Sequence, residues 1–447
     1  MTRTGAPPAA TTATLRPAVA VDTFKHSPAL GATMALLGVK GAVPLLHGAQ
    51  GCTAAAKVKL VNHFLESIPL ATSAMDEVST VLGGDENIRE AIVTLHAKAS
   101  PALIGVCSTA LTATRGDDLA GAVRLLRRRH PELDGLGIAV VDSPDFLGGL
   151  QEGFAAAVDS LLQTFAAPGS PIPGQVTVLA GASLAPGDVQ ELKDLHEAFG
   201  LRPLMVPDLA DSLDGHLDRE ATAPVAQGGV TVEELGRAGR SERLLVVGDS
   251  LLPAGRRLAE RCGLPLTAVP HLMTLEAVDG LMVRLAEWSG RAVPERCRRQ
   301  RRQVQDALLD THFHFGRKQV ALALESDLLT GMVAFLESTG ACIQAAVTPR
   351  DGDLALLESR CGGADLLVAS SQAVDLAERR GVTLCRMGFP IVDRLGQGLR
   401  VSIGYAGLLR LLIDLGNQLL EQELALSHRA RPGTPCASDL PSFPPIA

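Results

Sequence analysis

Short, largely apolar runs alternate with longer segments of helical character along most of the chain. The runs that we expect to form strands are 102–107, 137–141, 175–180, 244–247, 319–324, 343–347 and 365–368. Each is short and apolar at most positions, as strands are when helices cover both faces of a parallel sheet. The alternation therefore predicts an α/β fold in which parallel sheets are covered by helices.

Two breaks, near residues 168–174 and 311–317, divide this alternation into three similar units. A chain of 447 residues is long enough for two or three domains. The N-terminal segment is rich in Ala, Thr and Pro and the C-terminal one in Pro, so neither is expected to form a core. The predicted organisation is a disordered segment at 1–22, doubly wound (Rossmann-like) α/β domains at 23–170, 171–315 and 316–430, the last with a long terminal helix, and a disordered tail at 431–447.

Small or polar residues follow most of the predicted strands. They are Ser108 and Thr109, Asp142 and Ser143, Gly181 to Ser183, Gly248 to Ser250, and Ser370 and Ser371. In open α/β sheets, ligands bind at the carboxyl ends of strands, so chemistry is expected there. The sequence has no GxGxxG after a strand, no GxxxxGK[ST], no HExxH and no GxSxG, so nucleotide-binding, zinc-peptidase and hydrolase functions have no local support.

Composition and charge exclude several kinds of partner. Aromatic residues make up only 3% of the chain and its formal net charge is −8, which argues against nucleic-acid binding. No run of about 18 apolar residues and no secretion-signal pattern is present, so we expect no membrane association and a cytoplasmic location. The eight cysteines lie far apart without a CxxC pair, which predicts reduced thiols rather than disulfides or a self-contained zinc site.

Residues 47–53, with the sequence HGAQGCT, carry the most chemical information. Cys52 follows Gly48 and Gly51, and a helical segment over 54–64 begins at once. The amino end of a helix favours the thiolate, which is the form that binds metal, and glycines allow the main chain to approach a bulky inorganic cluster. We predict that Cys52 binds metal and that Gly48 and Gly51 contact the same cofactor. A general anion site and a buried structural thiol are the alternatives.

Other conspicuous residues are expected to have structural roles. His47 is interpreted as a hydrogen-bonded loop histidine, and the His312 and His314 pair lacks a third ligand nearby in the sequence. The arginines within 296–302 are typical of a solvated helix face, and residues 388–390 are expected to form a turn that positions the last helix. Four cysteines are also interpreted as structural: Cys262, Cys342, Cys361 and Cys385.

Several motifs together resemble the β-type chains of the nitrogenase component 1 family. They are HGAQGC at 47–52, MDEVSTVLGG at 75–84, SLDGH at 212–216, DTHF at 310–313, GFPIVDR at 388–394 and GY at 404–405. The resemblance extends from about Phe24 to the last long helix. It implies the fold of this family, with three α/β units.

The resemblance also identifies a loss of cluster ligands. In catalytic β chains of this family, three cysteines help to hold an eight-iron cluster, and the motifs place them at Ser27, Cys52 and Ala110 of this sequence. Only Cys52 remains a thiol, and the nearby Cys107 is expected to be a core residue. A four-iron cubane needs about one cysteine per iron, so if Cys52 binds one, an unlike partner chain must donate the other ligands.

The resemblance therefore implies an assembly subunit, most simply one without catalytic activity. It implies the β-type subunit of a scaffold complex on which the nitrogenase iron-molybdenum cofactor precursor is matured before transfer to apo-nitrogenase. The implied partners are a NifE-type α chain in an α2β2 heterotetramer, a NifB-type precursor donor and the nitrogenase iron protein. A 4Fe-4S cluster would be shared with the α chain, which would also hold most of the transiently bound precursor. The alternatives are a catalytic β chain of a nitrogenase or of a related nitrogenase-like reductase, and an α/β binding protein without a cluster.

Overall fold

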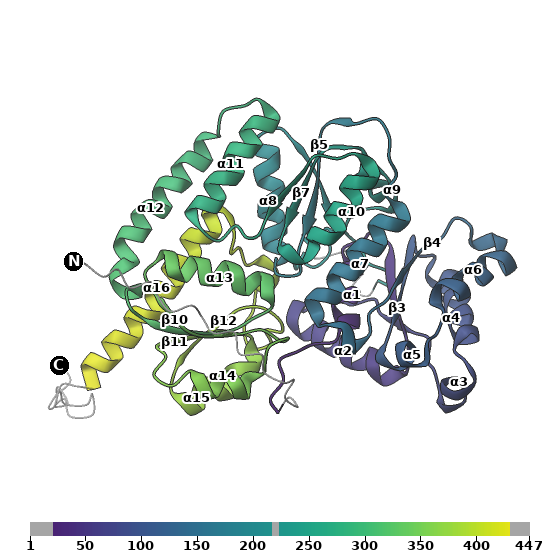
Figure 1. Cartoon of the computed structure of the whole chain (residues 1–447), viewed down its shortest axis with the longest axis horizontal. Coiled ribbons are helices and arrows are strands. Elements are labelled where there is room, and N and C mark those ends of the chain that lie inside the picture. Colours follow the sequence, from purple (N-terminus) through teal and green to yellow (C-terminus); the bar gives the residue numbers. More distant parts are fainter. Residues whose placement is uncertain (1–20, 217–222, 430–447) are drawn as a thin grey trace, which may run out of the picture.

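A computed structural model of the chain describes residues 21–216 and 223–429, and contains three parallel four-stranded sheets (Figure 1). Each sheet has the same topology, because its first strand in the sequence lies between the second and the third. The strand orders are β2-β1-β3-β4, β6-β5-β7-β8 and β10-β9-β11-β12. The prediction of three parallel α/β units is confirmed. The disorder predicted at the termini concerns residues that, apart from Val21 and Asp22, lie outside the described ranges.

The first unit carries the Cys52 segment. Its strands are β1 (Ala42–His47), β2 (Ala71–Thr72), β3 (Leu103–Ser108) and β4 (Gly137–Val141). Its helices are α1 (Pro28–Leu37), α2 (Gln50–Phe64), α3 (Glu77–Leu82), α4 (Asp85–Ala99), α5 (Ala110–Arg115), α6 (Leu119–Arg129) and α7 (Leu150–Phe165). Because side chains alternate along a strand, Leu45 and Ile104 pack with α4 and α6, whereas Leu46 and Cys107 join the core formed with α1 and α7.

The second unit repeats this arrangement. Its strands are β5 (Ile172–Ala180), β6 (Arg202–Val206), β7 (Ser241–Val247) and β8 (Leu266–Val269). Its helices are α8 (Pro186–Ala198), α9 (Val232–Arg237), α10 (Leu252–Cys262), α11 (Leu275–Ser289) and α12 (Glu295–Phe315). The central strands β5 and β7 are buried along most of their length, as expected for a sheet covered on both faces.

The third unit contains β9 (Gln319–Ala323), β10 (Cys342–Val347), β11 (Leu366–Ala369) and β12 (Thr383–Arg386). Its helices are α13 (Ser326–Ser338), α14 (Leu354–Arg360), α15 (Val374–Arg380) and α16 (Gly404–Arg429), and α16 packs along α12 (Figure 1). The first described residues also lie on this unit: Val21 N donates to Asp353 Oδ2 at 2.8 Å, and Phe24 is buried against its core.

Among the described helices, none combines the length and the apolar character needed to cross a bilayer.

Candidate functional site

Cys52 lies in the first turn of α2, directly after the central strand β1. Strand β1 ends at His47, α2 begins at Gln50, and Cys52 N donates to Ala49 O at 3.3 Å. The thiol is exposed. The predicted position of Cys52 at the amino end of a helix is confirmed, although the helix starts four residues before the expected 54–64 segment. Its role as a metal ligand stays a prediction.

The two neighbouring glycines have different surroundings. Apart from its chain neighbours and the backbone of its own helix, no atom of the described chain lies within 4 Å of a Cβ atom placed at Gly51, so this position faces open space. Gly48 is buried, and a Cβ atom there would lie 2.7 Å from Thr109 Oγ1. Packing within the chain therefore requires glycine at 48, whereas the space beside Gly51 fits a group supplied from outside. Contact of either glycine with a cofactor stays a prediction.

The residues around Cys52 can supply one thiolate to a cluster. Within residues 21–216 and 223–429, no group of three or more His, Cys, Asp or Glu side chains is placed to hold a metal ion. Ser27 caps α1 and donates to Asp145 Oδ1 at 2.5 Å, and Ala110 is the first residue of α5. Cys107 is fully buried, which raises the pKa of its thiol to about 12. It is a core residue, as predicted.

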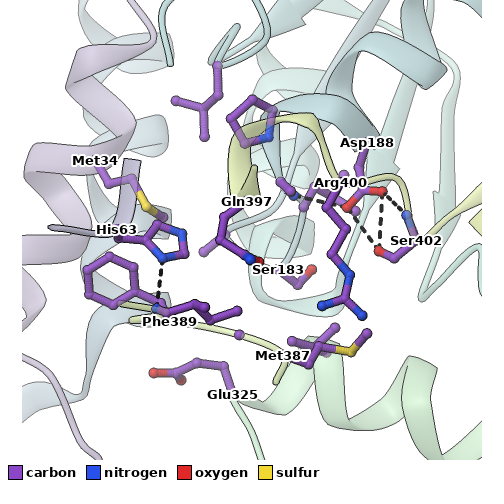
Figure 2. A pocket seen from close by; sticks show the side chains of 18 of the residues that line it. Met34, His63, Ser183, Asp188, Glu325, Met387, Phe389, Gln397, Arg400 and Ser402 are labelled. Carbon is purple, nitrogen blue, oxygen red and sulfur yellow. Dashed lines mark hydrogen bonds between the residues drawn. The ribbon is translucent and has the colours of Figure 1, made fainter. Parts of the chain in front are cut away.

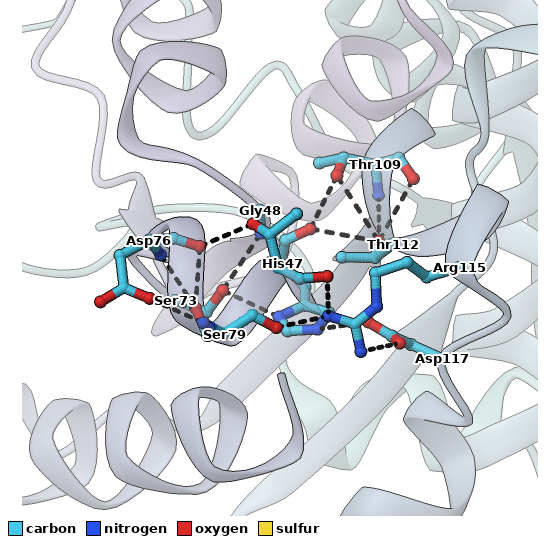
Figure 3. Close-up of polar contacts among 10 residues, drawn as sticks. His47, Gly48, Ser73, Asp76, Ser79, Thr109, Thr112, Arg115 and Asp117 are labelled. Atoms are coloured by element: carbon cyan, nitrogen blue, oxygen red, sulfur yellow. Dashed lines mark hydrogen bonds and ion pairs between the residues drawn. The ribbon is translucent and has the colours of Figure 1, made fainter. Parts of the chain in front are cut away.

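A buried polar network holds the strand end that precedes the loop (Figure 3). Gly48 N donates to Ser73 Oγ at 3.1 Å, and Ser73 Oγ lies 2.8 Å from His47 Nδ1. The Ser73 hydroxyl can thus donate to Nδ1, which leaves the ring proton on Nε2, 3.2 Å from Asp117 Oδ2. Burial lowers the pKa of His47, although Asp117 opposes this shift. His47 is the hydrogen-bonded histidine that was predicted.

Arg115 connects this network to α3. Its Nη2 atom lies 2.8 Å from Asp117 Oδ1, and its Nη1 atom donates to the carbonyl oxygens of Ser79 and Thr80 at 2.5 and 3.1 Å. The main chain makes a second connection, because Met75 N donates to Gly48 O at 3.0 Å. These contacts fix the position of α3, which begins two residues after Met75, relative to the segment that precedes Cys52.

Helix α3 has no buried residue. Its apolar side chains Val78, Val81 and Leu82 are 62%, 81% and 81% exposed, and we refer to these three residues as the α3 patch. Three large apolar side chains on one short helix, tied by Arg115 to a buried network, form a surface suited to contact with another protein.

A cavity lies where the three units meet, and we refer to it as the interunit cavity (Figure 2). Residues 388–390, predicted to form a turn, contribute Gly388 and Phe389 to its wall. The Phe389 ring packs edge-on against His63 of α2, with ring centroids 4.8 Å apart, and Ile391 N donates to His63 Nδ1 at 2.9 Å. This segment therefore contacts the helix that begins beside Cys52.

The remaining candidates have structural contacts. His312 and His314 lie on α12. Nδ1 of His312 is 2.7 Å from Leu309 O, and Nδ1 of His314 is 3.0 Å from Glu423. Most of the predicted arginine face is exposed on α12, and three of its members make ion pairs: Arg298 and Arg302 with Glu295, and Arg301 with Asp279. The structural cysteines occupy helix ends (Cys262, Cys361) and strands (Cys342, Cys385), with Cys342 exposed.

Comparison with known proteins gives a consistent result. Residues 27–354 and 350–420 match the family described as nitrogenase component 1 type oxidoreductase. The chain is 48% identical to the nitrogenase iron-molybdenum cofactor biosynthesis protein NifN of a Nostoc species, over 91% of this chain and 95% of the relative. It is 40% identical to the protein of the same name from Klebsiella pneumoniae, over 93% and 94%. Among solved structures, "Nitrogenase Cp1 at pH 6.5" superimposes with a TM-score of 0.88 at 26% identity, over 97% and 98% of the two chains.

Proposed function

This chain belongs to the nitrogenase component 1 type oxidoreductase family, and from this we propose that it is the β-type subunit of a scaffold on which the iron-molybdenum cofactor precursor is matured. Relatives of nearly the same length carry a name that states iron-molybdenum cofactor biosynthesis. The single observation that carries the proposal is the ligand set: Cys52 is an exposed thiol, while Ser27 and Ala110 occupy the other two positions where the family's catalytic β chains have cysteines.

The proposed resident cofactor is a 4Fe-4S cluster shared with a NifE-type α chain. Cys52 would supply one thiolate, and Gly51 would leave room for the cluster beside α2. A cubane takes about four ligands, and no cluster of ligating side chains surrounds Cys52 in the part of the chain that the structure describes. The partner chain is therefore proposed to donate about three thiolates, in an α2β2 heterotetramer.

The precursor itself is proposed to arrive from a NifB-type donor and to be held chiefly by the α-type partner. The interunit cavity of this chain encloses only about 80 Å³, and about 740 Å³ when its open mouth is included. The enclosed space holds roughly the volume of a few water molecules, which is small for a cluster of many iron and sulfur atoms. The cavity size thus supports a precursor site outside this chain's interior.

The α3 patch is proposed as this chain's part of the docking surface for the nitrogenase iron protein. The patch is apolar and exposed, and Arg115 and the Met75 amide connect its helix to the loop that carries Cys52. A partner bound there would lie close in the structure to the proposed cluster. A short distance between a docked iron protein and the cluster would favour electron transfer to the cluster.

The ligand role is tested by the Cys52→Ala variant, purified anaerobically as a complex with its co-expressed α-type partner. We expect a loss of about four irons per αβ pair and of the cubane's electron paramagnetic resonance signal, since a cubane lacking one thiolate is unstable. Cys342→Ala is the matched control, because Cys342 is also exposed but lies in the third unit. Unchanged iron content and signal in Cys52→Ala would refute the ligand role.

An acetylene-reduction assay distinguishes the scaffold subunit from a catalytic β chain. Adding iron protein, ATP and reductant to the purified complex is expected to give acetylene reduction far below that of a nitrogenase measured in parallel. A rate comparable to nitrogenase would support the catalytic alternative instead. A complex that purifies with its full iron content but transfers no cofactor to apo-nitrogenase would contradict the scaffold role.

A further inference from the structure

An open groove lies between helices of the second and third units, and we refer to it as the interhelix groove. Its walls come from α11 and α12 of the second unit and from α13 and α16 of the third, which gather on the side of the molecule away from α3 (Figure 1). The groove measures about 670 Å³ and opens to solvent. It is therefore a surface feature separate from the interunit cavity and from the α3 patch.

The base of the interhelix groove is apolar. The large apolar residues that line it come from all four helices: Leu275, Val304, Leu308, Phe335, Leu408 and Leu412. All but Leu275 and Leu308 are at most 2% exposed and form the base, whereas these two leucines are half-buried. Half-buried apolar side chains at the wall of an open groove offer contact area to an apolar group from another molecule.

The rim of the groove carries carboxylates, and no Lys or Arg lines it in the part of the chain that the structure describes. Asp279 is already paired, because Arg301 Nη2 lies 2.8 Å from its Oδ2 atom and Tyr405 OH donates to its Oδ1 atom at 2.5 Å. The Glu276 and Glu337 side chains are exposed and make no hydrogen bond or ion pair within the described ranges. These two carboxylates leave the groove with uncompensated negative charge.

A cation with an apolar part fits this groove. His271, which also lines it, adds no positive charge at neutral pH, since burial lowers the pKa of its ring. A metal ion does not fit, because among residues 21–216 and 223–429 no group of three or more His, Cys, Asp or Glu side chains is placed to hold one. A polyamine would pair with the carboxylates but would cover little of the apolar wall. A protein segment with basic and apolar side chains provides both contacts.

We propose that the interhelix groove docks a basic amphipathic segment of a partner protein. Its apolar side chains contact Leu275 and Leu308, and its lysines or arginines pair with Glu276 and Glu337. Charge complementarity selects this partner, since the groove presents carboxylates without counter-charges. An amphipathic helix suits a groove between helices, because its apolar side chains recur at i, i+3 and i+4 on one face. This docking surface goes beyond the scaffold function and does not depend on Cys52.

A fluorescent helical peptide of about 14 residues, with leucines on one face and lysines on the other, is the probe. Its anisotropy during titration with the full-length protein gives the affinity. We expect a Kd on the order of 100 μM or tighter. Affinity should fall about tenfold between about 50 and 500 mM NaCl, because salt screens exposed carboxylates. A peptide with glutamate in place of lysine is expected not to bind. Absence of binding by the lysine peptide would overturn the proposal.

Charge variants test whether the peptide sits in the groove. Glu276→Gln combined with Glu337→Gln removes both unpaired carboxylates and is expected to weaken binding about tenfold. Glu90→Gln combined with Glu260→Gln is the matched control, because both side chains are exposed, on α4 and α10, outside the groove. The control removes the same net charge and should leave binding almost unchanged. Equal losses in the two double variants would show that the peptide responds only to net charge and would refute the site.

A second variant fills the groove without changing its charge. Ala334→Trp places a large side chain on the α13 wall and is expected to abolish binding, whereas Ala120→Trp, at an exposed position on α6, is the control. Melting temperatures show whether both variants are folded, and the glutamate variants give an independent result if Ala334→Trp is not. Spermidine is the competitor. Displacement of the peptide by spermidine at a concentration equal to the peptide's Kd would overturn the assignment to a protein segment.

Discussion

Nε2 of His47 lies 3.2 Å from Oδ2 of Asp117, and the two side chains are 0% and 6% exposed. Through Ser73 on one side of the ring and Arg115 on the other, this pair joins the Gly48 amide to the carbonyl oxygens of α3. The network therefore fixes the strand end from which the Cys52 loop starts. It also connects this loop, through the hydrogen bonds of Arg115, to α3, the surface helix where we propose that a partner docks.

Ser73→Ala is expected to destabilise the chain. The substitution leaves the Gly48 amide and Nδ1 of His47 buried without their partner, at a cost of about 1–3 kcal/mol. Denaturant unfolding measures this change. Ser67→Ala is the control, because Ser67 is exposed in the loop after α2, and it should alter stability by less than about 0.5 kcal/mol. Equal effects of the two variants would show that the network adds nothing to stability.

Thiol labelling should divide the cysteines by burial. In the chain without a cluster, we expect iodoacetamide to modify Cys52 and Cys342, which are exposed, at least tenfold faster than Cys107 and Cys385. Burial raises the pKa of both latter thiols, that of Cys107 to about 12. Mass spectrometry of the digested protein gives the rates. In the iron-loaded complex, Cys52 alone should become protected; continued labelling of Cys52 there would contradict its ligand role.

Glu325→Gln is expected to stabilise the protein above neutral pH. The folded-state pKa of about 7 exceeds the ordinary value of 4.5, so the unfolded chain releases this proton first as the pH rises. Stability is therefore lost between pH 4.5 and 7, by at most roughly 3 kcal/mol. The groups around Glu325 are Glu152, Asp327 and the cation Lys25.

Melting temperatures of the wild type and Glu325→Gln measured from pH 5 to 8 check this. The difference should be small at pH 5 and should grow to its maximum above pH 7. Glu337→Gln, in the same unit, is the control for removing one exposed carboxylate. A constant difference across this range would mean that Glu325 does not titrate near neutrality.

Charged substitutions in the α3 patch should weaken docking of the iron protein. Val81→Asp combined with Leu82→Asp places two charges on side chains that are each 81% exposed, so the fold should tolerate them, while an apolar interface would not. We expect at least a tenfold loss of affinity, on the order of 1.4 kcal/mol or more, with iron content unchanged. Val283→Asp, at an exposed position on α11, is the control. Full affinity of the double variant in a binding assay would exclude the patch.

The sequence pattern predicted the strands that are long and apolar. It did not predict strands that contain proline or that are very short. All seven predicted runs contain strand residues, but the central strand β1 was not predicted because Pro44 lies within it, and proline usually argues against a central strand. Strand β6 contains Pro203, and β2, β8 and β12 are edge strands of four residues or fewer. Strands this short contain too few residues for an alternating hydrophobic pattern to be recognised.

The candidate site was predictable only where it is local in sequence. Cys52, its glycines and its helix start lie within a few residues of one another, so composition and spacing are informative. The supporting contacts are not local: His47 meets Asp117 across 70 residues, and His63 meets Ile391 across 328. Nothing in the neighbourhood of Asp117 signals a histidine partner, since that pairing depends on the order of strands in the sheet.

Gly48→Ala and Gly51→Ala form a matched pair that separates packing within the chain from contact with a cluster. At Gly48 the added methyl group would lie 2.7 Å from Thr109 Oγ1, which itself donates to His47 O at 2.8 Å. We expect a loss of about 1–3 kcal/mol from this overpacking, seen in denaturant unfolding. At Gly51, inside α2 and facing open space, alanine should leave the chain equally stable or stabilise it by up to about 1 kcal/mol.

The complex with the α-type partner should respond differently at Gly51. If a cluster held by both chains lies against this position, the Gly51→Ala methyl group occupies its space, and the iron content per αβ pair falls although the chain itself is no less stable. Ala54→Gly, three residues further along α2 at an exposed position, controls for a change in the helix alone. Full iron content in Gly51→Ala would show that the cluster does not lie against Gly51. Cys52 could then bind the cluster only if the main chain at Gly51 does not contact it.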